Sequence, residues 1–263
     1  LEDISFQVIN PDARNTIIER LEYLKAKDDN IIDEIRYELK NIFSNTSVAT
    51  ICTALIKKGL KNHFIQGVSP LNTKLPNMVG LAYTVRYIPA REDLNSIEVF
   101  KNPEHPQRLA IEECPKDYVL IFDSRKDPRA ASAGAILVTR LMVRGCAGVV
   151  TDGGFRDSNE IKNLNIPAYH NRPSSPTNLT LHQAIDINIP IGCGDVAIWP
   201  NDLIVGDKEG VVVVPNEIIK EISDEVKSMT IYEDYVIDKV QKGATIRGLY
   251  PLTDESEKKA FEN

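Results

Sequence analysis

The chain has 263 residues, of which 42% are hydrophobic, and its 38 acidic and 31 basic side chains give a formal net charge of −7. This length can bury a substantial core, and the excess of acids argues against a nucleic-acid-binding surface, which needs clustered Lys and Arg. No apolar run is long enough to predict a membrane span, and the acidic start Leu1-Glu2-Asp3 is unlike a signal peptide. We therefore expect a cytoplasmic protein without a nucleic-acid or membrane partner.

The first part of the chain is predicted to be helical. Apolar residues recur at helical spacing through residues 11–60. Ser47 is expected to cap a helix over Val48–Lys58, and Gly59 is expected to end it.

Short apolar runs rich in β-branched residues then predict strands. They are Met78–Ile88, Tyr118–Phe122, Gly148–Thr151, Asp186–Ile189, Val196–Ile198, Leu203–Val205 and Val211–Val214. Helices are expected between the early strands, at His105–Glu113 and Ala135–Arg144, whereas tight turns join the later strands. This mixture predicts layered sheets with helices on one side. Two amphipathic helices are expected to follow, at Asn216–Met229 and Ile231–Lys242.

The segment from Gly134 to Asp157 places a helix start, an apolar strand and a Gly-Gly turn directly before an Arg-Asp pair. Gly134 is expected to open the turn before the helix, whose free N–H groups and positive dipole end suit a carboxylate or phosphate. The Gly-Gly turn lets the backbone pass close to a ligand, so that Arg156 supplies a fixed cation and Asp157 a hard oxygen ligand. On the residues alone, a surface β-turn with a local ion pair is an equal alternative.

This segment resembles the signature of the family that contains the regulator of ribonuclease activity A and the 4-hydroxy-4-methyl-2-oxoglutarate aldolases. In that family a Gly-acid-Leu-Leu turn precedes Gly-x-x-Arg-Asp at the same spacing. The run Ile191–Pro215, which reads IGCGDVAIWPNDLIVGDKEGVVVVP, is similar to a later signature of the family. The resemblance covers roughly residues 45–230.

The resemblance implies an α/β fold, the swivelling β/β/α three-layer domain, assembled as a homotrimer or homohexamer with sites between subunits. We therefore expect a single RraA-like domain over residues 1–263. Its core would span about residues 46–230, with added helical extensions at about 1–45 and about 231–263.

The resemblance also implies roles for the residues of the motif. Asp157 matches the family's metal ligand, and one carboxylate suffices for a Mg²⁺ or Mn²⁺ ion whose other ligands are water and substrate. Arg156 matches the residue that contacts the pyruvyl oxygen in the aldolases, where a permanent cation stabilises enolate charge. Ile136 and Leu137 match the positions whose backbone N–H groups bind the substrate carboxylate.

Ala135 departs from the family pattern, because the aldolases have an acid there that is implicated in handling water at the metal. Alanine has no titratable group, so either another acid replaces it or the activity differs. The candidates within the chain are Asp152, Glu92 and Asp93, for each of which a structural role is the alternative. A neighbouring subunit is a further source of acids, with Glu221, Glu225 and Glu233 among them.

Two further residues are candidates for substrate contacts. Arg140 lies one helical turn after Ile136 and is expected to hold a second carboxylate or a hydroxyl of a longer substrate, with an ordinary surface role as the alternative. His170 follows a predicted strand at Ile166–Tyr169 and belongs to the residue type that titrates near neutrality, although a structural histidine is the commoner case.

Other cofactors find no support in the sequence. The Gly192-Cys193-Gly194 run lacks the third glycine of a dinucleotide fingerprint, and no Gly-Lys-Ser/Thr motif occurs, so neither NAD nor ATP is expected. The histidines show no ligand spacing, which excludes zinc. The four widely separated cysteines are expected to be reduced and mostly buried.

On the resemblance we expect a class II pyruvate aldolase type of lyase, dependent on Mg²⁺ or Mn²⁺. It would cleave a 4-hydroxy-2-oxo acid or a 2-keto-3-deoxy sugar acid to pyruvate, with oxaloacetate decarboxylation as a side activity. The main alternative is a non-catalytic regulator that binds and inhibits a ribonuclease complex, because a fold alone does not fix a function. A methyltransferase is a third and weaker hypothesis.

Overall fold

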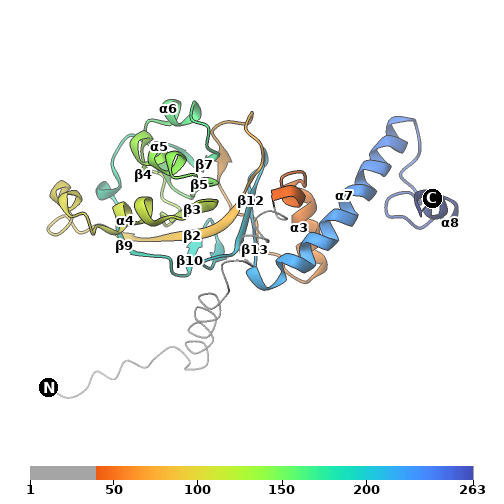
Figure 1. Ribbon diagram of the computed structural model, residues 1–263, viewed down its shortest axis with the longest axis horizontal. Coiled ribbons are helices and arrows are strands. Elements are labelled where there is room, and N and C mark those ends of the chain that lie inside the picture. The colour runs from red at the N-terminus through yellow and green to blue at the C-terminus, as the bar shows by residue number, and fades with distance from the viewer. Residues whose placement is uncertain (1–39, 263) are drawn as a thin grey trace, which may run out of the picture. The chain divides into compact units, whose positions relative to one another are not determined.

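The computed structural model describes residues 40–262, all of which belong to the second of two units, residues 39–263, into which the chain divides (Figure 1). The helical prediction for residues before 40 lies outside the described residues. The α-helices are α3 (Val48–Lys57), α4 (Pro106–Glu113), α5 (Ala135–Val143), α6 (Ser158–Lys162), α7 (Ile219–Gln241) and α8 (Glu255–Glu262). The 3₁₀ helices are η1 (Ile97–Lys101), η2 (Asn178–Thr180) and η3 (Asn216–Ile218).

The strands include every apolar run that the sequence predicts, with small shifts in their bounds. They are β1 (Ser69–Pro70), β2 (Met78–Pro89), β3 (Tyr118–Asp123), β4 (Ala131–Ala133), β5 (Gly148–Thr151), β6 (Gly154–Phe155), β7 (Ala168–His170), β8 (Arg172–Pro173), β9 (His182–Ile187), β10 (Ile191–Cys193), β11 (Val196–Ile198), β12 (Leu203–Gly206) and β13 (Val211–Val214).

The main sheet has the order β1-β7-β5-β3-β2-β12-β13, and β9 also pairs with β2. Strands β2, β3, β5 and β7 run parallel to one another, whereas β12 is antiparallel to both of its neighbours. β13 is a run of four valines that is buried at every position. Continuous apolar runs of this kind are typical of strands that are covered on both faces.

The sheet lies between a helical layer and a small hairpin. On one face, α4 contacts β2 and β9, and α5 contacts α4 and β5 (Figure 1). On the other face, the hairpin β10–β11 contacts β2 and β3. Val119 and Ile121 of β3 belong to the same buried cluster as Ile191 of the hairpin. Because side chains alternate along a strand, Leu120 and Phe122 face the helices. The order of layers is therefore β/β/α.

Three parallel strands of the main sheet lead, beyond their carboxyl ends, into a second, smaller parallel sheet. β3 is followed by β4, β5 by β6 and β7 by β8, and the small sheet has the order β4-β6-β8. The link between β5 and β6 holds the Gly-Gly turn, where a Cβ added at Gly153 would lie 2.6 Å from the Cβ of Ser124. This crowding explains the glycine, and the tight turn brings Arg156 and Asp157 to the carboxyl edge of the main sheet.

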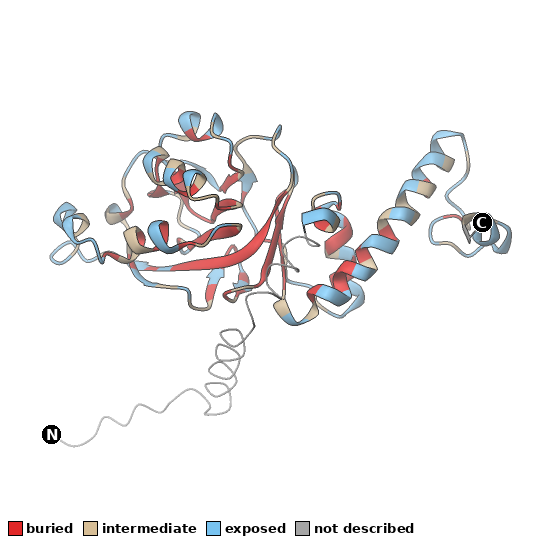
Figure 2. Ribbon diagram, viewed as in Figure 1, coloured by how far each residue is buried: buried red, intermediate tan, exposed pale blue. Residues whose placement is uncertain are grey.

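Helix α3 begins at Val48 as the sequence predicts and ends at Lys57, one residue before the predicted end. The backbone N–H of Thr50 donates to the Ser47 hydroxyl at 3.0 Å, and Gly59 adopts a left-handed φ of +82° after the last turn. α7 packs against α3, and most of its buried residues lie in its first half (Figure 2). Within residues 40–262, every helix is too short or too polar to cross a membrane.

The prediction of two C-terminal helices, Asn216–Met229 and Ile231–Lys242, is wrong, because α7 is one continuous helix from Ile219 to Gln241. No Gly or Pro interrupts this stretch. Thr230, at the predicted break, donates its hydroxyl to the Val226 carbonyl at 2.8 Å, so its polar group is satisfied inside the helix.

The strand predicted at Asp186–Ile189 is shifted toward the N-terminus and spans His182–Ile187. Asn188 adopts a left-handed φ of +53°, which turns the chain out of the strand before Ile189. Asparagine tolerates this conformation better than most residues, so the end of the strand follows from the residue that stands there.

Candidate functional site

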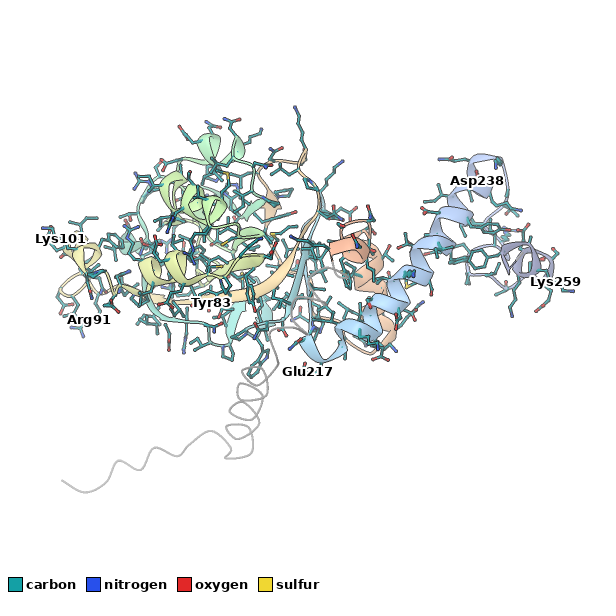
Figure 3. The ribbon with its side chains drawn as sticks, viewed as in Figure 1. Tyr83, Arg91, Lys101, Glu217, Asp238 and Lys259 are labelled. Carbon is teal, nitrogen blue, oxygen red and sulfur yellow. The ribbon has the colours of Figure 1, made fainter. Side chains whose placement is uncertain are left out.

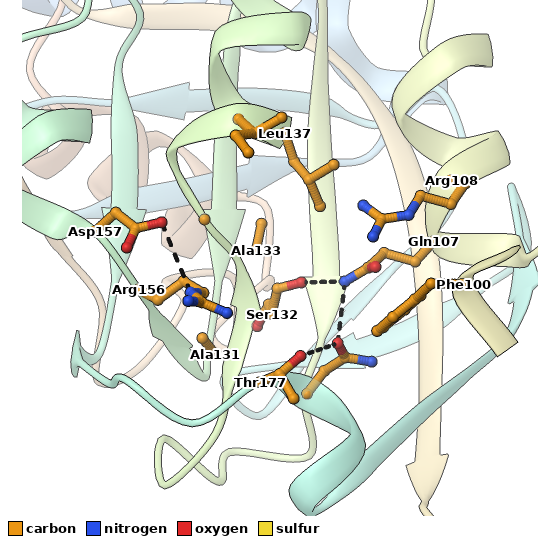
Figure 4. A pocket seen from close by; sticks show the side chains of 13 residues that line it. Phe100, Gln107, Arg108, Ala131, Ser132, Ala133, Leu137, Arg156, Asp157 and Thr177 are labelled. Carbon is orange, nitrogen blue, oxygen red and sulfur yellow. Dashed lines mark hydrogen bonds and ion pairs between the residues drawn. The ribbon is translucent and has the colours of Figure 1, made fainter. Parts of the chain in front are cut away.

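A cavity of about 430 Å³ lies beside the N-terminus of α5 (Figure 4). The motif contributes Gly134, Ile136, Leu137, Arg156 and Asp157 to its lining. Gly134, before α5, and Arg156, after β6, are 22 positions apart in the sequence, and the pairing of β4 with β6 brings them together. The turn before α5 and the Arg-Asp pair therefore face the same space.

The start of α5 offers unused backbone donors to this cavity. The first N–H groups of an α-helix have no acceptor within the helix. Val138 makes the first internal bond, to the Gly134 carbonyl at 3.1 Å, and the Ala135 N–H donates to Oδ2 of Asp157 at 3.2 Å. Within residues 40–262, the N–H groups of Ile136 and Leu137 have no acceptor. Together with the positive end of the helix dipole, they suit an anionic oxygen.

Arg156 and Asp157 lie next to each other at the rim of the cavity. The Nε of Arg156 is 3.7 Å from Oδ2 of Asp157, and the two side chains are 49% and 41% exposed. An ion pair this long and this exposed contributes little to stability. Asp157 also holds a left-handed backbone, with φ of +54° and ψ of +38°, a conformation that side chains adopt at a cost and that often marks functional sites.

The donor set suits one class of metal ion. Asp157 is the sole carboxylate among the described residues that line the cavity. In the part of the chain that the structure describes, no group of three or more His, Cys, Asp or Glu side chains is arranged to hold a metal. One carboxylate fits Mg²⁺ or Mn²⁺, which retain several waters, and does not fit zinc, which takes three or four protein ligands.

Gly134 is required by close packing at the site. A Cβ added there would lie 2.7 Å from both Cγ of Arg156 and Oδ2 of Asp157. We expect Gly134→Ala to displace both side chains and to lower the free energy of unfolding by about 1–3 kcal/mol. The matched control is Gly192→Ala, because a Cβ there meets nothing within 4 Å. Chemical denaturation measures both variants, and equal stability would show that the crowding at Gly134 relaxes without cost.

Arg140 lies outside the cavity lining. Its Nε donates to Oε1 of Glu112 at 3.0 Å, and its Nη2 donates to Oε2 at 2.7 Å. This bidentate pair joins α5 to α4, and it occupies the guanidinium for which the sequence suggested a substrate contact.

Glu92 and Asp93 also lie away from the cavity of their own chain. They are exposed and follow Arg91 in the segment between β2 and η1, residues 90–96 (Figure 3). Asp93 accepts from the Arg91 guanidinium, with Oδ2 2.6 Å from Nη2. Neither acid replaces, within one chain, the one that Ala135 lacks.

Asp152 is buried and serves as a backbone acceptor. Its Oδ1 accepts from the N–H of Ser124 at 2.7 Å, and its Oδ2 accepts from the N–H groups of Lys126 and Gly194 at 3.0 Å each. Burial raises the pKa of Asp152 to about 6, although these hydrogen bonds oppose the shift. The residue does not line the cavity, and it joins the ends of β3 and β5 to the hairpin β10–β11.

We expect Asp152→Asn to lower the free energy of unfolding by about 1–3 kcal/mol at pH 7, because an amide cannot accept from three N–H groups. The pKa of Asp152 is raised on folding, so the folded state binds the proton more tightly, and wild-type stability from this group falls as the pH rises from about 4 to about 6. The variant lacks this dependence on pH. Chemical denaturation at pH 4.5 and pH 7 gives the free energy of unfolding of wild type and of Asp152→Asn. Wild type should exceed the variant by more at pH 4.5 than at pH 7, and an excess that grows with pH would contradict the raised pKa.

The acids of α7 that the sequence suggested for a neighbouring site are engaged within the chain. Glu221, Glu225 and Glu233 contact, in that order, Lys58, Lys57 and Thr50. These contacts join α7 to the region of α3, and the three acids do not line the cavity.

His170 has the surroundings of a structural residue. It is buried, its ring stacks on Phe155 with centroids 5.7 Å apart, and it does not line the cavity. Burial lowers the pKa of His170 to about 4, so the ring is neutral at physiological pH.

The sequence did not indicate several other residues of the cavity lining. They are Phe100, Gln107, Arg108, Thr177 and Asn178. Gln107 is buried, and its Nε2 donates to the Ser132 carbonyl at 2.7 Å, which fixes α4 against β4. These residues belong to no motif. For Gln107 and Arg108, the sequence signal that could have indicated a site was the presence of polar side chains on the inward face of the predicted helix His105–Glu113.

Known proteins share this fold and this sequence pattern. A protein of Halalkalibacterium halodurans named "Putative 4-hydroxy-4-methyl-2-oxoglutarate aldolase" is 32% identical over 178 residues, which cover 68% of this chain and 78% of that protein. Streptomyces coelicolor RraAS2, described as an unusual member of the RNase ES inhibitor RraA protein family, matches with a TM-score of 0.66 at 26% identity, over 75% of this chain and 94% of that chain.

An uncharacterized protein from Pseudomonas syringae matches with a TM-score of 0.68 at 22% identity, over 81% of this chain and 96% of that chain. These two structures confirm the fold that the sequence predicts. The RraA-like family model, described as Aldolase/RraA, matches residues 48–213, which include the whole lining of the cavity. The chain therefore belongs to the RraA-like family.

Proposed function

We propose that this protein is a divalent-metal-dependent lyase of the class II pyruvate aldolase type. It would cleave a 4-hydroxy-2-oxo acid or a 2-keto-3-deoxy sugar acid and release pyruvate. The observation that carries the proposal is that Asp157, Arg156 and the free N–H groups of α5 line one cavity. The similarity to the protein named as an aldolase in Halalkalibacterium halodurans supports the same reaction class.

The site can bind the 2-oxo acid end of such a substrate. The N–H groups of Ile136 and Leu137 would donate hydrogen bonds to the carboxylate, which would place the neighbouring 2-oxo group near Arg156 and Asp157. A Mg²⁺ or Mn²⁺ ion held by Asp157 would polarise the 2-oxo group as a Lewis acid.

The reaction requires two proton transfers and one bond cleavage. A base takes the proton of the 4-hydroxyl, the C3–C4 bond breaks, and its electron pair passes through C3 to the 2-oxo oxygen. The products are a carbonyl compound that contains the former C4 and the enolate of pyruvate, whose charge the Arg156 guanidinium stabilises. A proton then adds to C3 and gives pyruvate. Oxaloacetate reaches the same enolate by loss of CO₂, which accounts for the proposed side activity.

The proton carrier is the part of the site that differs from the aldolase pattern. Ala135 has no titratable group, and among the described residues that line the cavity Asp157 is the sole acid. We infer that water in the cavity, or an acid from a neighbouring subunit of a trimer or hexamer, carries these protons.

A lactate-dehydrogenase-coupled assay of pyruvate release tests the proposal. The panel comprises 4-hydroxy-2-oxo acids, 2-keto-3-deoxy sugar acids and oxaloacetate, each with Mg²⁺ or Mn²⁺ and each with an EDTA control. We expect metal-dependent release from at least one compound, and equal release with EDTA would contradict metal dependence.

A second candidate function is that of a non-catalytic regulator that binds a ribonuclease complex. The similarity to Streptomyces coelicolor RraAS2 and the alanine at position 135 favour it. A purified ribonuclease complex that binds wild type and Arg156→Gln equally, together with no turnover of the substrate panel, would support this role. If Arg156→Gln no longer bound the ribonuclease complex, this result would contradict a ribonuclease-binding surface that is independent of the cavity.

A further inference from the structure

We propose that Arg108 is a second anion-binding residue of the cavity and selects substrates whose tail, opposite the 2-oxo acid end, carries a negative charge. The inference rests on the proposed function, and it adds a residue that determines specificity. Arg108 and Arg156 are the two basic side chains among the described residues that line the cavity.

Arg108 is held in place by packing. It lies on α4 and is half-buried, and its guanidinium carbon sits 4.6 Å from the centroid of the Phe100 ring. The Phe100 ring in turn contacts His105 edge-on, with centroids 5.0 Å apart. A guanidinium held over an aromatic ring in this way is oriented by the ring, and its N–H groups remain free to bind a ligand. The side chain is therefore preorganised for a ligand.

The charge of Arg108 has no partner in the part of the chain that the structure describes. Within residues 40–262, no carboxylate pairs with it, whereas Arg91, Arg129, Arg140 and Arg156 each have one. Burial lowers the pKa of Arg108, and the Tyr87 phenol opposes this effect only in part. A half-buried cation without a counter-charge is costly, and an anionic ligand would remove that cost.

Arg108 and the Arg-Asp pair lie on opposite sides of the cavity (Figure 4). Leu137, Ala133 and Ser132 lie between them, so both apolar and polar groups line the space that joins the two arginines. A ligand bound by its 2-oxo acid end at α5 and Arg156 would extend its tail toward Arg108. The guanidinium fork matches the two oxygens of a carboxylate. A neutral sugar-like tail would leave the charge of Arg108 unpaired.

Binding of two 2-oxo acids of equal chain length tests this inference without turnover. 2-Oxoglutarate carries a terminal carboxylate, and 2-oxopentanoate carries a methyl group in its place. Isothermal titration calorimetry with Mg²⁺ would compare wild type, Arg108→Gln and Arg108→Lys. Arg140→Gln is the matched control, because that arginine lies on the adjacent helix in a pair with Glu112 and does not line the cavity.

We expect wild type to prefer 2-oxoglutarate. Arg108→Gln should weaken 2-oxoglutarate binding by about 10–100-fold and change 2-oxopentanoate binding by less than about 3-fold. Arg108→Lys should recover part of the loss, and Arg140→Gln should bind as wild type. Equal weakening for both ligands, or a wild type without preference, would overturn the inference. Binding of both ligands without pyruvate release in the coupled assay would contradict the proposed function alone, and binding of neither would contradict both.

Discussion

Replacing Asp157 by alanine is expected to abolish metal-dependent pyruvate release, with a loss of at least about 10³-fold in kcat/KM. Asp157 is the sole acid among the described residues that line the cavity, so no other carboxylate of this lining can take over as the metal ligand. Its Oδ2 also accepts from the Ala135 N–H, so alanine would in addition remove a contact that positions the start of α5. Steady-state kinetics at saturating Mg²⁺ or Mn²⁺ measures the loss.

The matched control is Glu160→Ala. Glu160 is an exposed acid in the short helix that Asp157 caps, it has the same charge, and it does not line the cavity. Its loss should leave kcat/KM within about 2-fold of wild type, because an exposed charge outside the site is screened by solvent and salt. Full turnover by Asp157→Ala, or an equal loss in both variants, would contradict the role given to Asp157.

Replacing Arg156 by glutamine is expected to lower kcat by about 10²–10³-fold, because the guanidinium stabilises charge that develops only as the C–C bond breaks. KM should change less than kcat, since the free N–H groups of α5 would still bind the substrate carboxylate in the proposed mode. Arg156→Lys should retain part of the activity, because it keeps the charge and loses the fork geometry.

Arg172→Gln is the control for Arg156. Arg172 is exposed on β8, the next strand of the small sheet after β6, and it does not line the cavity. Its kcat and KM should match those of wild type. An increase in KM alone for Arg156→Gln would assign Arg156 to substrate binding and contradict its role in stabilising the enolate.

The central strands could be predicted from the sequence because they are apolar on both faces. Val211–Val214 and Gly148–Thr151 are strands at their predicted bounds, and every residue in them is buried. The strands of the small sheet, β4, β6 and β8, have two or three residues each. Such segments are too short to carry a periodicity, and they exist because longer parallel strands bring them together.

Part of the site followed from the motif. The Gly134 turn, Arg156 and Asp157 do line one cavity, and what they bind or catalyse there stays a prediction. The location of Arg140 could not be predicted from the motif. Its position one turn after Ile136 gives no information about Glu112 of α4, with which it forms an ion pair. Arg108 was missed for the same reason, since the cavity wall it forms depends on packing between α4 and β4.

Ala135 shows how far a family resemblance extends. The backbone around it keeps the geometry that the carboxylate-binding turn needs, because N–H groups are independent of the side chain. The acid that the aldolases carry at this position is absent. Enolate stabilisation by Arg156 would therefore work together with water or an acid of a neighbouring subunit as the proton carrier, and a test of both should not depend on the tail of an unknown substrate.

Exchange of the methyl protons of pyruvate with D₂O, followed by proton NMR, is that test. Pyruvate is the proposed common product, and its enolate forms whenever a C3 proton is lost. We predict that the protein with Mg²⁺ or Mn²⁺ accelerates the loss of the methyl signal, and that EDTA, Asp157→Ala or Arg156→Gln removes the acceleration. Exchange no faster than in buffer with metal alone would contradict the claim that this cavity stabilises a pyruvate enolate.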